Sequence, residues 1–315
     1  MDIIFNLLCL LACVFLLVMI AALVCFFKVF YSPARKPLGE NEYEIPPGRI
    51  YEPFRERMVE WTKQMRTTPH ETVSIKSYDG LTLYGKYYEQ KKGAPVELLF
   101  HGYKGSAERD LCGGLARCFA VGHNVIVISQ RGGDNSEGNV ITFGIREHRD
   151  CLEWIEYAIS RFGDDVEIIL SGVSMGAATV MMAGGRELPD NVKLILADCG
   201  YTSPKEIIKK VIREMHLPAD LLYPLVRLGG VLYGSFDVEE YSPIEAVGKC
   251  KVPVIFFHGD TDDYVPCDMS RELYDACASE KKLVIIEGAG HGLCYPQNKE
   301  RYVAELDAFC QKYGL

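Results

Sequence analysis

After residue 72 the chain alternates between apolar runs typical of strands and helical patterns, and this alternation constrains the fold more than any other feature. Several runs, such as Val252–Phe257, are almost continuously apolar, which is typical of strands covered by helices on both faces. Elsewhere, Leu152, Ile155, Ile159 and Phe162 are spaced as one apolar face of a helix. The alternation predicts an α/β fold in which a mostly parallel sheet has helices on both faces. Eight strands are expected, near residues 72–78, 81–90, 96–102, 124–130, 166–173, 193–199, 252–258 and 281–287.

The first two expected strands meet at Asp79–Gly80, a dipeptide that favours the tight turn of a β-hairpin. A chain of 315 residues is long enough for one large α/β domain with a well-buried core, whereas a second domain of similar size would be crowded. We therefore expect one folded domain with additions.

The N-terminus is an apolar run, Ile3–Phe27, that contains no charged residue. As a helix it would be roughly 37 Å long, enough to cross the hydrocarbon core of a membrane with some tilt. A cleaved signal peptide is the alternative, but it requires a basic segment before the run, a shorter apolar core and a small-residue cleavage site. We expect residues 1–30 to form an uncleaved transmembrane anchor.

Residues 31–48 contain four prolines and Gly39 among polar side chains, a composition typical of a short, stiff linker. The folded domain is expected to cover residues 49–315. Lys28, Arg35 and Lys36 follow the apolar run and no basic residue precedes it, so the positive-inside rule places this domain in the cytoplasm.

Cysteine usage agrees with a reducing compartment. Nine of the twelve cysteines follow the apolar run, and this odd, scattered set does not form the pattern of a disulfide framework. No CxxC pair or cluster of His and Cys predicts a metal site.

One connection, about residues 201–250, is unusually long for a link between two strands. Ser203–Glu206 has the sequence of a capping box, with Pro204 at the first helical position, and a second helical stretch covers 219–233. We interpret this segment as a small helical cap over a binding pocket. The alternative is a pair of ordinary packing helices.

The motif Gly172–Val173–Ser174–Met175–Gly176 follows a predicted buried strand and precedes a helical run of small residues. A serine in this strand-turn-helix context is exposed at a sharp, strained turn, as a nucleophile requires. The glycines fit the turn because side chains there would collide with the neighbouring strand and helix.

A serine nucleophile needs a general base, because an unassisted hydroxyl reacts poorly at neutral pH. His291 lies in the glycine-rich turn 288–292 directly after the last predicted strand, where it can face Ser174. His101 and His258 end apolar strands, where a structural hydrogen-bonding role is equally reasonable. The acid that orients the base is expected in the loop after the strand 252–258, where Asp260, Asp262 and Asp263 compete.

These motifs resemble those of the α/β-hydrolase superfamily, near its serine aminopeptidase-like and monoacylglycerol lipase-like branch of bacterial hydrolases. The resemblance covers nearly all of the chain after Thr72 and implies the α/β-hydrolase fold. The branch carries its acid in the pattern His-Gly-x-x-Asp-x-x-Val-Pro, which matches His258, Gly259, Asp262, Val265 and Pro266 and selects Asp262. The resulting order of serine, aspartate and histidine is that of the α/β-hydrolase triad.

An oxyanion hole needs two donors, one of which is expected to be the backbone N–H of Met175, the residue after the nucleophile. The segment His101–Gly102–Tyr103 resembles the superfamily's His-Gly-x oxyanion loop and implies the N–H of Tyr103 as the second. Residues 130–138 resemble another superfamily loop, but Ser129 and Asp134 depart from its pattern, so we assign this loop a structural role only.

Together these features predict a serine hydrolase that cleaves carboxylic esters or thioesters of a lipophilic acyl substrate without a cofactor. A serine aminopeptidase-like activity is the alternative, with Asp198 as the only candidate to bind the amine of the substrate. A non-catalytic, membrane-anchored binding module is a further alternative. A net charge of −9 argues against a nucleic-acid partner.

Overall fold

The structure is a computed structural model that describes residues 2–33, 35 and 38–315. Lys36 and Pro37, which entered the arguments about orientation and the linker, lie outside the described residues. The helices are α1 (Asp2–Val29), η1 (Arg49–Phe54), α2 (Arg55–Thr67), α3 (Ala107–Ala120), α4 (Glu147–Phe162), α5 (Met175–Gly184), α6 (Pro204–Glu214), α7 (Ala219–Gly229), η2 (Gly230–Gly234), α8 (Pro243–Val247), α9 (Cys267–Ala276), α10 (Cys294–Gln297) and α11 (Lys299–Gln311).

All eight predicted strands are present and form one sheet in the order β1-β2-β4-β3-β5-β6-β7-β8. The β1–β2 and β2–β4 pairs are antiparallel, and the remaining pairs are parallel. Gly80 has a φ of 88° in the predicted hairpin turn, a conformation that glycine adopts without strain. The strands are β1 (Glu71–Lys76), β2 (Thr82–Tyr88), β3 (Val96–Phe100), β4 (Asn124–Ile128), β5 (Ile168–Val173), β6 (Val192–Asp198), β7 (Val254–Gly259) and β8 (Lys281–Ile286).

Both faces of the central strands β3 to β7 are buried, as the continuously apolar runs predicted. Successive residues of one strand enter different cores: Leu99 packs with α2, α3 and α11, whereas Leu98 packs with α4 and α5. The same alternation occurs at Ile255 and Phe256 of β7. This arrangement of a mostly parallel, eight-stranded sheet between two helical layers is the α/β-hydrolase fold.

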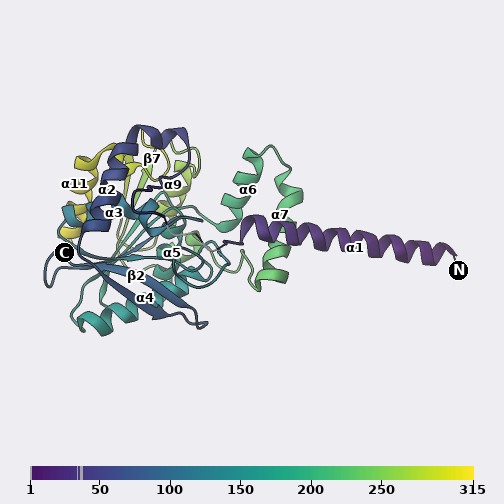
Figure 1. Cartoon of the computed structure of the whole chain (residues 1–315), viewed down its shortest axis with the longest axis horizontal. Helices are drawn as coiled ribbons and strands as arrows, with labels where there is room; N and C mark the ends of the chain where they lie inside the picture. Colours follow the sequence, from purple (N-terminus) through teal and green to yellow (C-terminus); the bar gives the residue numbers. More distant parts are fainter. Residues whose placement is uncertain (1, 34, 36–37) are drawn as a thin grey trace.

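The long helix α1 projects away from the body of the molecule (Figure 1). It is long and apolar enough to cross a membrane, with a mean hydropathy of 3.3 over its most apolar window. Its first part is exposed, whereas Ala22, Phe26 and the following Phe30 are buried. These residues contact the segment that contains α7 and η2, so only the C-terminal third of α1 belongs to the folded core.

Residues 31–48 differ from the expected linker, because the described part of this segment is bonded to the body. Tyr31 forms a β-bridge with Val140, and the hydroxyl of Ser32 donates to the carbonyl oxygen of Gly132 at 2.9 Å. The guanidinium of Arg66 donates to the carbonyl oxygens of residues 40 and 42. The composition indicates that this segment lacks helices and strands, but it does not reveal these long-range hydrogen bonds.

The segment 201–250 is helical, as predicted, and contains α6, α7, η2 and α8. The side chain of Ser203 accepts a hydrogen bond from the N–H of Glu206 at 3.1 Å, and Pro204 opens the helix. Figure 1 shows α6 and α7 beside α1, at a distance from the main body of the sheet. We refer to residues 203–234 as the cap.

Candidate active site

Ser174 occupies the sharp turn between β5 and α5. Its φ of 56° and ψ of −116° lie in a region that non-glycine residues rarely adopt, so the turn is strained. A Cβ at position 172 would lie 2.2 Å from the backbone of Gly176, and one at 176 would lie 2.1 Å from the carbonyl oxygen of Phe100. Both glycines are therefore required, as the motif predicted.

The structure brings the three predicted triad residues together. The hydroxyl of Ser174 donates to Nε2 of His291 at 2.9 Å, and Nδ1–H of His291 donates to Oδ2 of Asp262 at 2.7 Å. The other two carboxylates of the loop do not contact His291: Asp260 accepts from the N–H of Gly288, and Asp263 holds Lys210 through its carbonyl oxygen. The geometry therefore selects Asp262 among the three candidates.

Several donors hold the Asp262 carboxylate in its ionised form. Oδ1 accepts the N–H groups of Tyr264 at 2.9 Å and Val265 at 2.8 Å. Burial alone would raise the pKa of Asp262, but hydrogen bonds from His258 and His291 outweigh it and hold this pKa below its ordinary value. The carboxylate is thus suited to orient an imidazole and to stabilise its cation.

His258 supports this loop from beneath. Its Nε2 lies 2.8 Å from the carbonyl oxygen of Val265 and 3.2 Å from Oδ2 of Asp262, and its Nδ1 lies 2.6 Å from the hydroxyl of Ser270. The sequence allowed a structural hydrogen-bonding role for His258 but did not indicate its contact with Asp262.

The two predicted oxyanion donors lie close to Ser174 along the chain or in the neighbouring loop. Met175 is the first residue of α5, so its N–H is one of the donors that a helix leaves without an intrahelical partner. Tyr103 lies in the loop after β3, where the carboxylate of Asp110 accepts the N–H of Gly102 at 3.2 Å and fixes the turn. A Cβ at position 102 would lie 3.5 Å from the Cβ of Ser174, so this loop passes directly beside the nucleophile.

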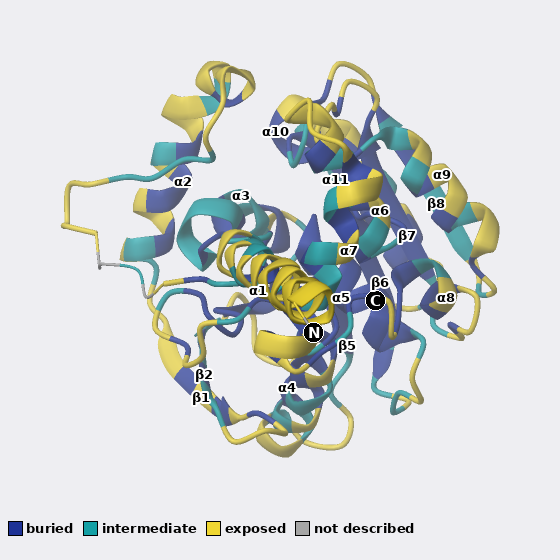
Figure 2. Cartoon of the chain, turned by 90° about the vertical axis from the view of Figure 1, so that its right-hand side faces the viewer, coloured by how far each residue is buried: buried dark blue, intermediate teal, exposed yellow. Residues whose placement is uncertain are grey.

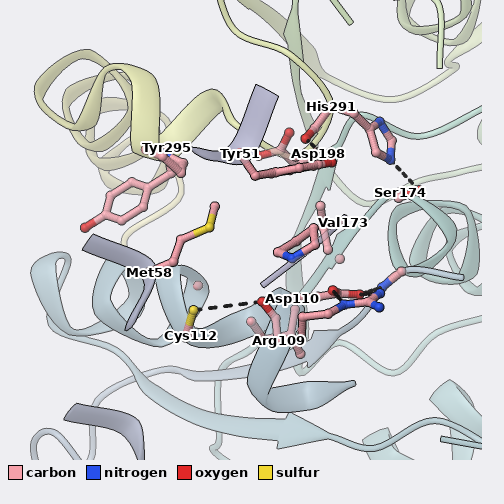
Figure 3. Close-up of a pocket in the computed structure, with 18 of the residues that line it drawn as sticks. Tyr51, Met58, Arg109, Asp110, Cys112, Val173, Ser174, Asp198, His291 and Tyr295 are labelled. Atoms are coloured by element: carbon pink, nitrogen blue, oxygen red, sulfur yellow. Dashed lines mark hydrogen bonds and ion pairs between the residues drawn. The ribbon is translucent and has the colours of Figure 1, made fainter. Parts of the chain in front are cut away.

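A pocket of about 670 Å³ opens beside Ser174. Figure 3 shows Met58, Cys112 and Tyr295 at the end of the pocket away from Ser174 and His291. Its walls are mainly apolar and aromatic, and they include Met58, Trp61, Leu99, Leu111, Cys112, Val173, Leu196 and Tyr295. The dimensions and the lining suit a lipophilic chain.

The residues that cover this pocket differ from the prediction. Among the described residues, none of the segment 201–250 lines it; one wall instead comes from residues 46–51 and α2. Tyr51 of η1 donates a hydrogen bond to the carbonyl oxygen of His291 at 3.0 Å. The cap packs against α1 instead, because the apolar end of α1 provides a partner for its inner face.

Asp198 ends β6 and forms part of the inner wall of the pocket. Its Oδ2 accepts the hydroxyl of Tyr302 at 3.0 Å, whereas Oδ1 has no hydrogen-bond partner among the described residues. Burial raises the pKa of Asp198, which favours its neutral form.

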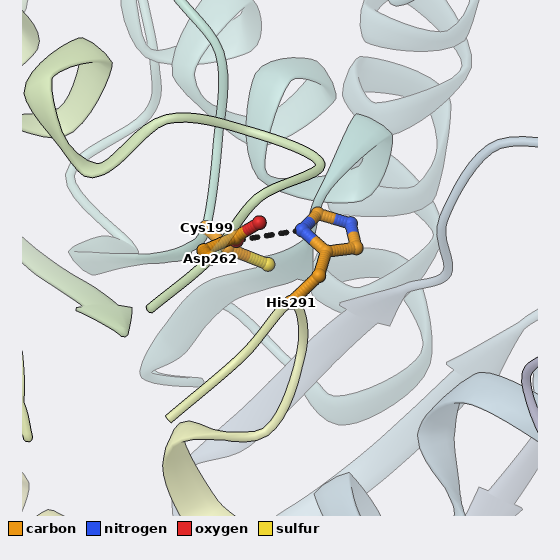
Figure 4. Close-up of side chains that lie close together, drawn as sticks. All are labelled: Cys199, Asp262 and His291. Atoms are coloured by element: carbon orange, nitrogen blue, oxygen red, sulfur yellow. Dashed lines mark hydrogen bonds and ion pairs between the residues drawn. The ribbon is translucent and has the colours of Figure 1, made fainter. Parts of the chain in front are cut away.

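One group of side chains of the metal-binding types occurs among the described residues, and it overlaps the triad. It consists of Cys199, Asp262 and His291, whose ligand atoms lie within 4.8 Å of one another (Figure 4). Burial raises the pKa of Cys199 far above its ordinary value, and a metal ligand must be a thiolate. His291 Nδ1 is moreover bonded to Asp262. These features fit a proton-transfer pair better than a metal site.

The model of the prolyl oligopeptidase family matches residues 118–314, which include all three triad residues. The chain belongs to the prolyl oligopeptidase family. As a member of this family it is a serine hydrolase. The predictions of an α/β-hydrolase fold and of a serine hydrolase are thus confirmed.

Relatives of this prolyl oligopeptidase family member occur in bacteria and fungi. The chain is 28% identical to YqkD of Bacillus subtilis over 190 residues, which cover 60% of this chain and 62% of YqkD. It is 27% identical to Bem46 of Schizosaccharomyces pombe over 260 residues, 81% of this chain and 76% of Bem46. A membrane protein of Saccharomyces cerevisiae is 28% identical over 167 residues, 52% of each chain.

Solved structures show the same fold as this family member. The esterase PF2001 of Pyrococcus furiosus has a TM-score of 0.68 at 17% identity and covers 90% of this chain and 99% of its own. Est1E of Butyrivibrio proteoclasticus, solved with bound ferulic acid, has a TM-score of 0.57 at 20% identity and covers 76% of this chain and 98% of its own.

Proposed function

We propose that this chain hydrolyses ester or thioester bonds of a lipophilic acyl substrate, with Ser174 as the nucleophile, His291 as the general base and Asp262 as the orienting acid. The observation that carries the proposal is the hydrogen-bond chain from Ser174 through His291 to Asp262, next to an apolar pocket of about 670 Å³. Family membership argues against the alternative of a non-catalytic binding module.

In the first half of the reaction, Nε2 of His291 takes the hydroxyl proton of Ser174 while Oγ attacks the acyl carbonyl carbon. Asp262 stabilises the imidazolium that forms. The imidazolium then gives its proton to the leaving alcohol or thiol as the carbon–oxygen or carbon–sulfur bond breaks. Water repeats the sequence on the acyl-enzyme and releases the acid.

The oxyanion of each tetrahedral intermediate is assigned to the N–H groups of Met175 and Tyr103. Met175 supplies a free helix N-terminal donor, and the loop that carries Tyr103 is fixed beside Ser174 by Asp110. Both donors are backbone groups, so substitution of their side chains leaves them in place.

Two features favour a lipophilic substrate. The walls of the pocket are mainly apolar and aromatic, and they include Tyr103 and Lys104, which are bonded to the carbonyl oxygens of Val29 and Lys28 at the end of α1. The pocket therefore lies next to the point where the apolar helix joins the body. A substrate that partitions into a membrane would be concentrated at this point.

We assign α1 to the membrane as an uncleaved anchor, and the catalytic domain to the cytoplasmic side. The length and hydropathy of α1 support its role as an anchor, and Lys28 and Arg35 after the apolar run support the cytoplasmic orientation. Ala22 and Phe26 are buried, and α1 packs against α7 and η2. This burial argues against removal of the helix as a signal peptide, because cleavage would expose the apolar residues that pack against Phe26. A membrane protein is among its relatives.

A peptidase activity is the second candidate, because the unpartnered Oδ1 of Asp198 lies in the pocket wall. An ionised carboxylate there would bind the amino terminus of a peptide. The raised pKa of Asp198 disfavours that ionised form. This feature makes an ester or thioester the better substrate.

The test is labelling of membrane fractions with a fluorophosphonate probe, which modifies activated serines. Wild type should label, whereas Ser174→Ala and His291→Ala should not. Both variants keep the backbone of the site, and circular dichroism checks that they fold. A folded wild type that does not label would contradict the assignment of Ser174.

The substrate class is then tested with p-nitrophenyl esters of graded acyl length and with aminoacyl p-nitroanilides. We expect the specificity constant kcat/KM to rise with acyl length until the pocket is filled. Faster cleavage of the anilides than of any ester would favour the peptidase alternative.

A further inference from the structure

The cap exposes several large apolar side chains. Figure 2, viewed from the N-terminal end of α1, shows exposed turns of the cap beside this helix. Six of these side chains are between 36% and 69% exposed, and we call them the apolar face of the cap: Met215, Leu217, Leu221, Val231, Leu232 and Tyr233. Isolated exposed apolar residues are ordinary, but a group of this kind on one small element marks an interaction surface.

The segment α7–η2 is apolar on two opposite sides. Ala219, Tyr223, Val226 and Gly230 are spaced by four, three and four residues and are buried. A second set with the same helical spacing, residues 221, 225, 228 and 232, consists entirely of leucines and is partly or fully exposed. A helix that met water on its outer side would carry polar residues there.

Close packing attaches the cap to α1. A Cβ at Gly229 would lie 2.5 Å from the carbonyl oxygen of Ala22 and 3.2 Å from Cβ of Phe26, so only glycine allows the two helices to cross here. The hydroxyl of Tyr233 donates to the carbonyl oxygen of Met19 at 3.1 Å. The cap therefore reaches along α1 as far as Met19.

The length of α1 determines where this contact lies in a membrane. Residues 2–18 are all exposed, and the uncharged part of this stretch, 3–18, rises roughly 24 Å as a helix. A hydrocarbon core is about 30 Å thick, and tilt reduces the thickness that a helix crosses. About one more turn is needed, which includes Met19 and Ala22, the residues that the cap contacts.

We propose that the apolar face of the cap lies in the hydrocarbon boundary of the membrane that α1 crosses, in contact with lipid. This inference rests on the membrane anchoring given under the proposed function. Three observations favour lipid as the partner of this face. They are the exposed leucines of the cap, the short part of α1 that the cap does not contact, and the packing of the cap against an apolar helix. A second copy of the chain or another protein is the competing occupant.

The charges beyond the cap fit the same placement. Lys28 lies five residues after Leu23, roughly 8 Å farther along the helix, which is the depth of the headgroup region. The Lys104 ammonium donates to the carbonyl oxygen of Lys28, so two positive charges gather at this level. Anionic or zwitterionic headgroups provide phosphates for both.

The test is quenching of tryptophan fluorescence by brominated phosphatidylcholine, with the full chain reconstituted in vesicles. The two native tryptophans, Trp61 and Trp154, are buried and give the background. Leu221→Trp and Leu232→Trp place the probe on the cap. Phe15→Trp is the control inside α1, and Gln311→Trp is the exposed control near the C-terminus, at the opposite end of the molecule (Figure 1).

We expect the emission added at positions 221 and 232 to be lost with brominated lipid to an extent similar to that of Phe15→Trp, whereas the emission of Gln311→Trp is retained. Cap probes that behave like Gln311→Trp, or a Phe15→Trp probe that is not quenched, would overturn the proposal. Hydrolysis of a water-soluble acetyl ester in the same vesicles reports on catalysis separately, so a failure of the proposed reaction is distinguishable from a failure of the cap placement.

Discussion

The hydroxyl of Tyr103 donates a 2.5 Å hydrogen bond to the carbonyl oxygen of Val29, the last residue of α1. The ring of Tyr103 stacks on Phe143 with 4.9 Å between centroids. The backbone N–H of the same residue is the proposed second oxyanion donor. The end of the apolar helix thus holds the loop on which transition-state stabilisation is expected to depend.

Tyr103→Phe tests whether this bond contributes to catalysis. The substitution keeps the ring and the backbone N–H but removes one hydrogen bond of about 0.5–1.5 kcal/mol, so we expect kcat to fall roughly two- to tenfold. The control is Tyr233→Phe, which removes a comparable bond between α1 and the cap, away from Ser174. Equal losses of kcat in both variants would mean that catalysis depends on the attachment of α1 in general and not on the position of the loop that carries Tyr103.

The assignment of the acid is tested by Asp262→Asn and Asp260→Asn. In the first variant the amide cannot serve as the charged acceptor of Nδ1–H of His291, so we expect kcat to fall roughly 10⁴-fold with the fold retained. The Asp260 carboxylate accepts a hydrogen bond from the N–H of Gly288, away from His291, so kcat of Asp260→Asn should remain within severalfold of wild type. The measurement is steady-state hydrolysis of a p-nitrophenyl ester, and a larger loss in Asp260→Asn would contradict the assignment.

The local parts of this site were predictable, whereas the distant contacts were not. Ser174 is recognisable because strand, tight turn and helix follow one another within a few residues, and steric limits at Gly172 and Gly176 dictate the motif. The contact of Tyr51 with His291 joins residues 240 positions apart, and no local pattern encodes it. No local pattern shows where the cap docks either, and its expected position over the pocket was wrong. Its helices were correctly predicted, but their partner, the end of α1, depends on tertiary packing.

The length of acyl chain that the pocket accepts should depend on Met58, a buried residue at the end away from Ser174 (Figure 3). Met58→Trp fills this space, so we expect kcat/KM for decanoyl esters to fall roughly tenfold or more, while acetyl esters are hydrolysed as by wild type. Met58→Leu preserves the volume and should keep the wild-type chain-length profile. An unchanged profile in Met58→Trp would place the acyl chain elsewhere.

Stability at acidic pH should depend on His148, which is buried in α4. Its Nδ1–H donates to the carbonyl oxygen of Gly144 at 2.9 Å, and Nε2 lies 3.2 Å from the guanidinium of Arg186, so this nitrogen must stay unprotonated. Burial, followed by the charges of Arg186 and Arg149, lowers the pKa of His148 from 6.5 to about 4. The folded state therefore binds this proton less readily than the unfolded chain does.

Above pH 6.5 this pKa difference costs the folded state no stability. As the pH falls from 6.5 toward about 4, the unfolded chain binds the proton first, and the free energy of unfolding decreases by roughly 3 kcal/mol. We expect His148→Gln to be less sensitive to acid than wild type across this window, because glutamine does not titrate. Arg186→Gln should weaken the dependence without abolishing it, since burial is the larger cause. Thermal unfolding in detergent at several pH values measures both effects, and parallel curves for wild type and His148→Gln would show that another group controls acid sensitivity.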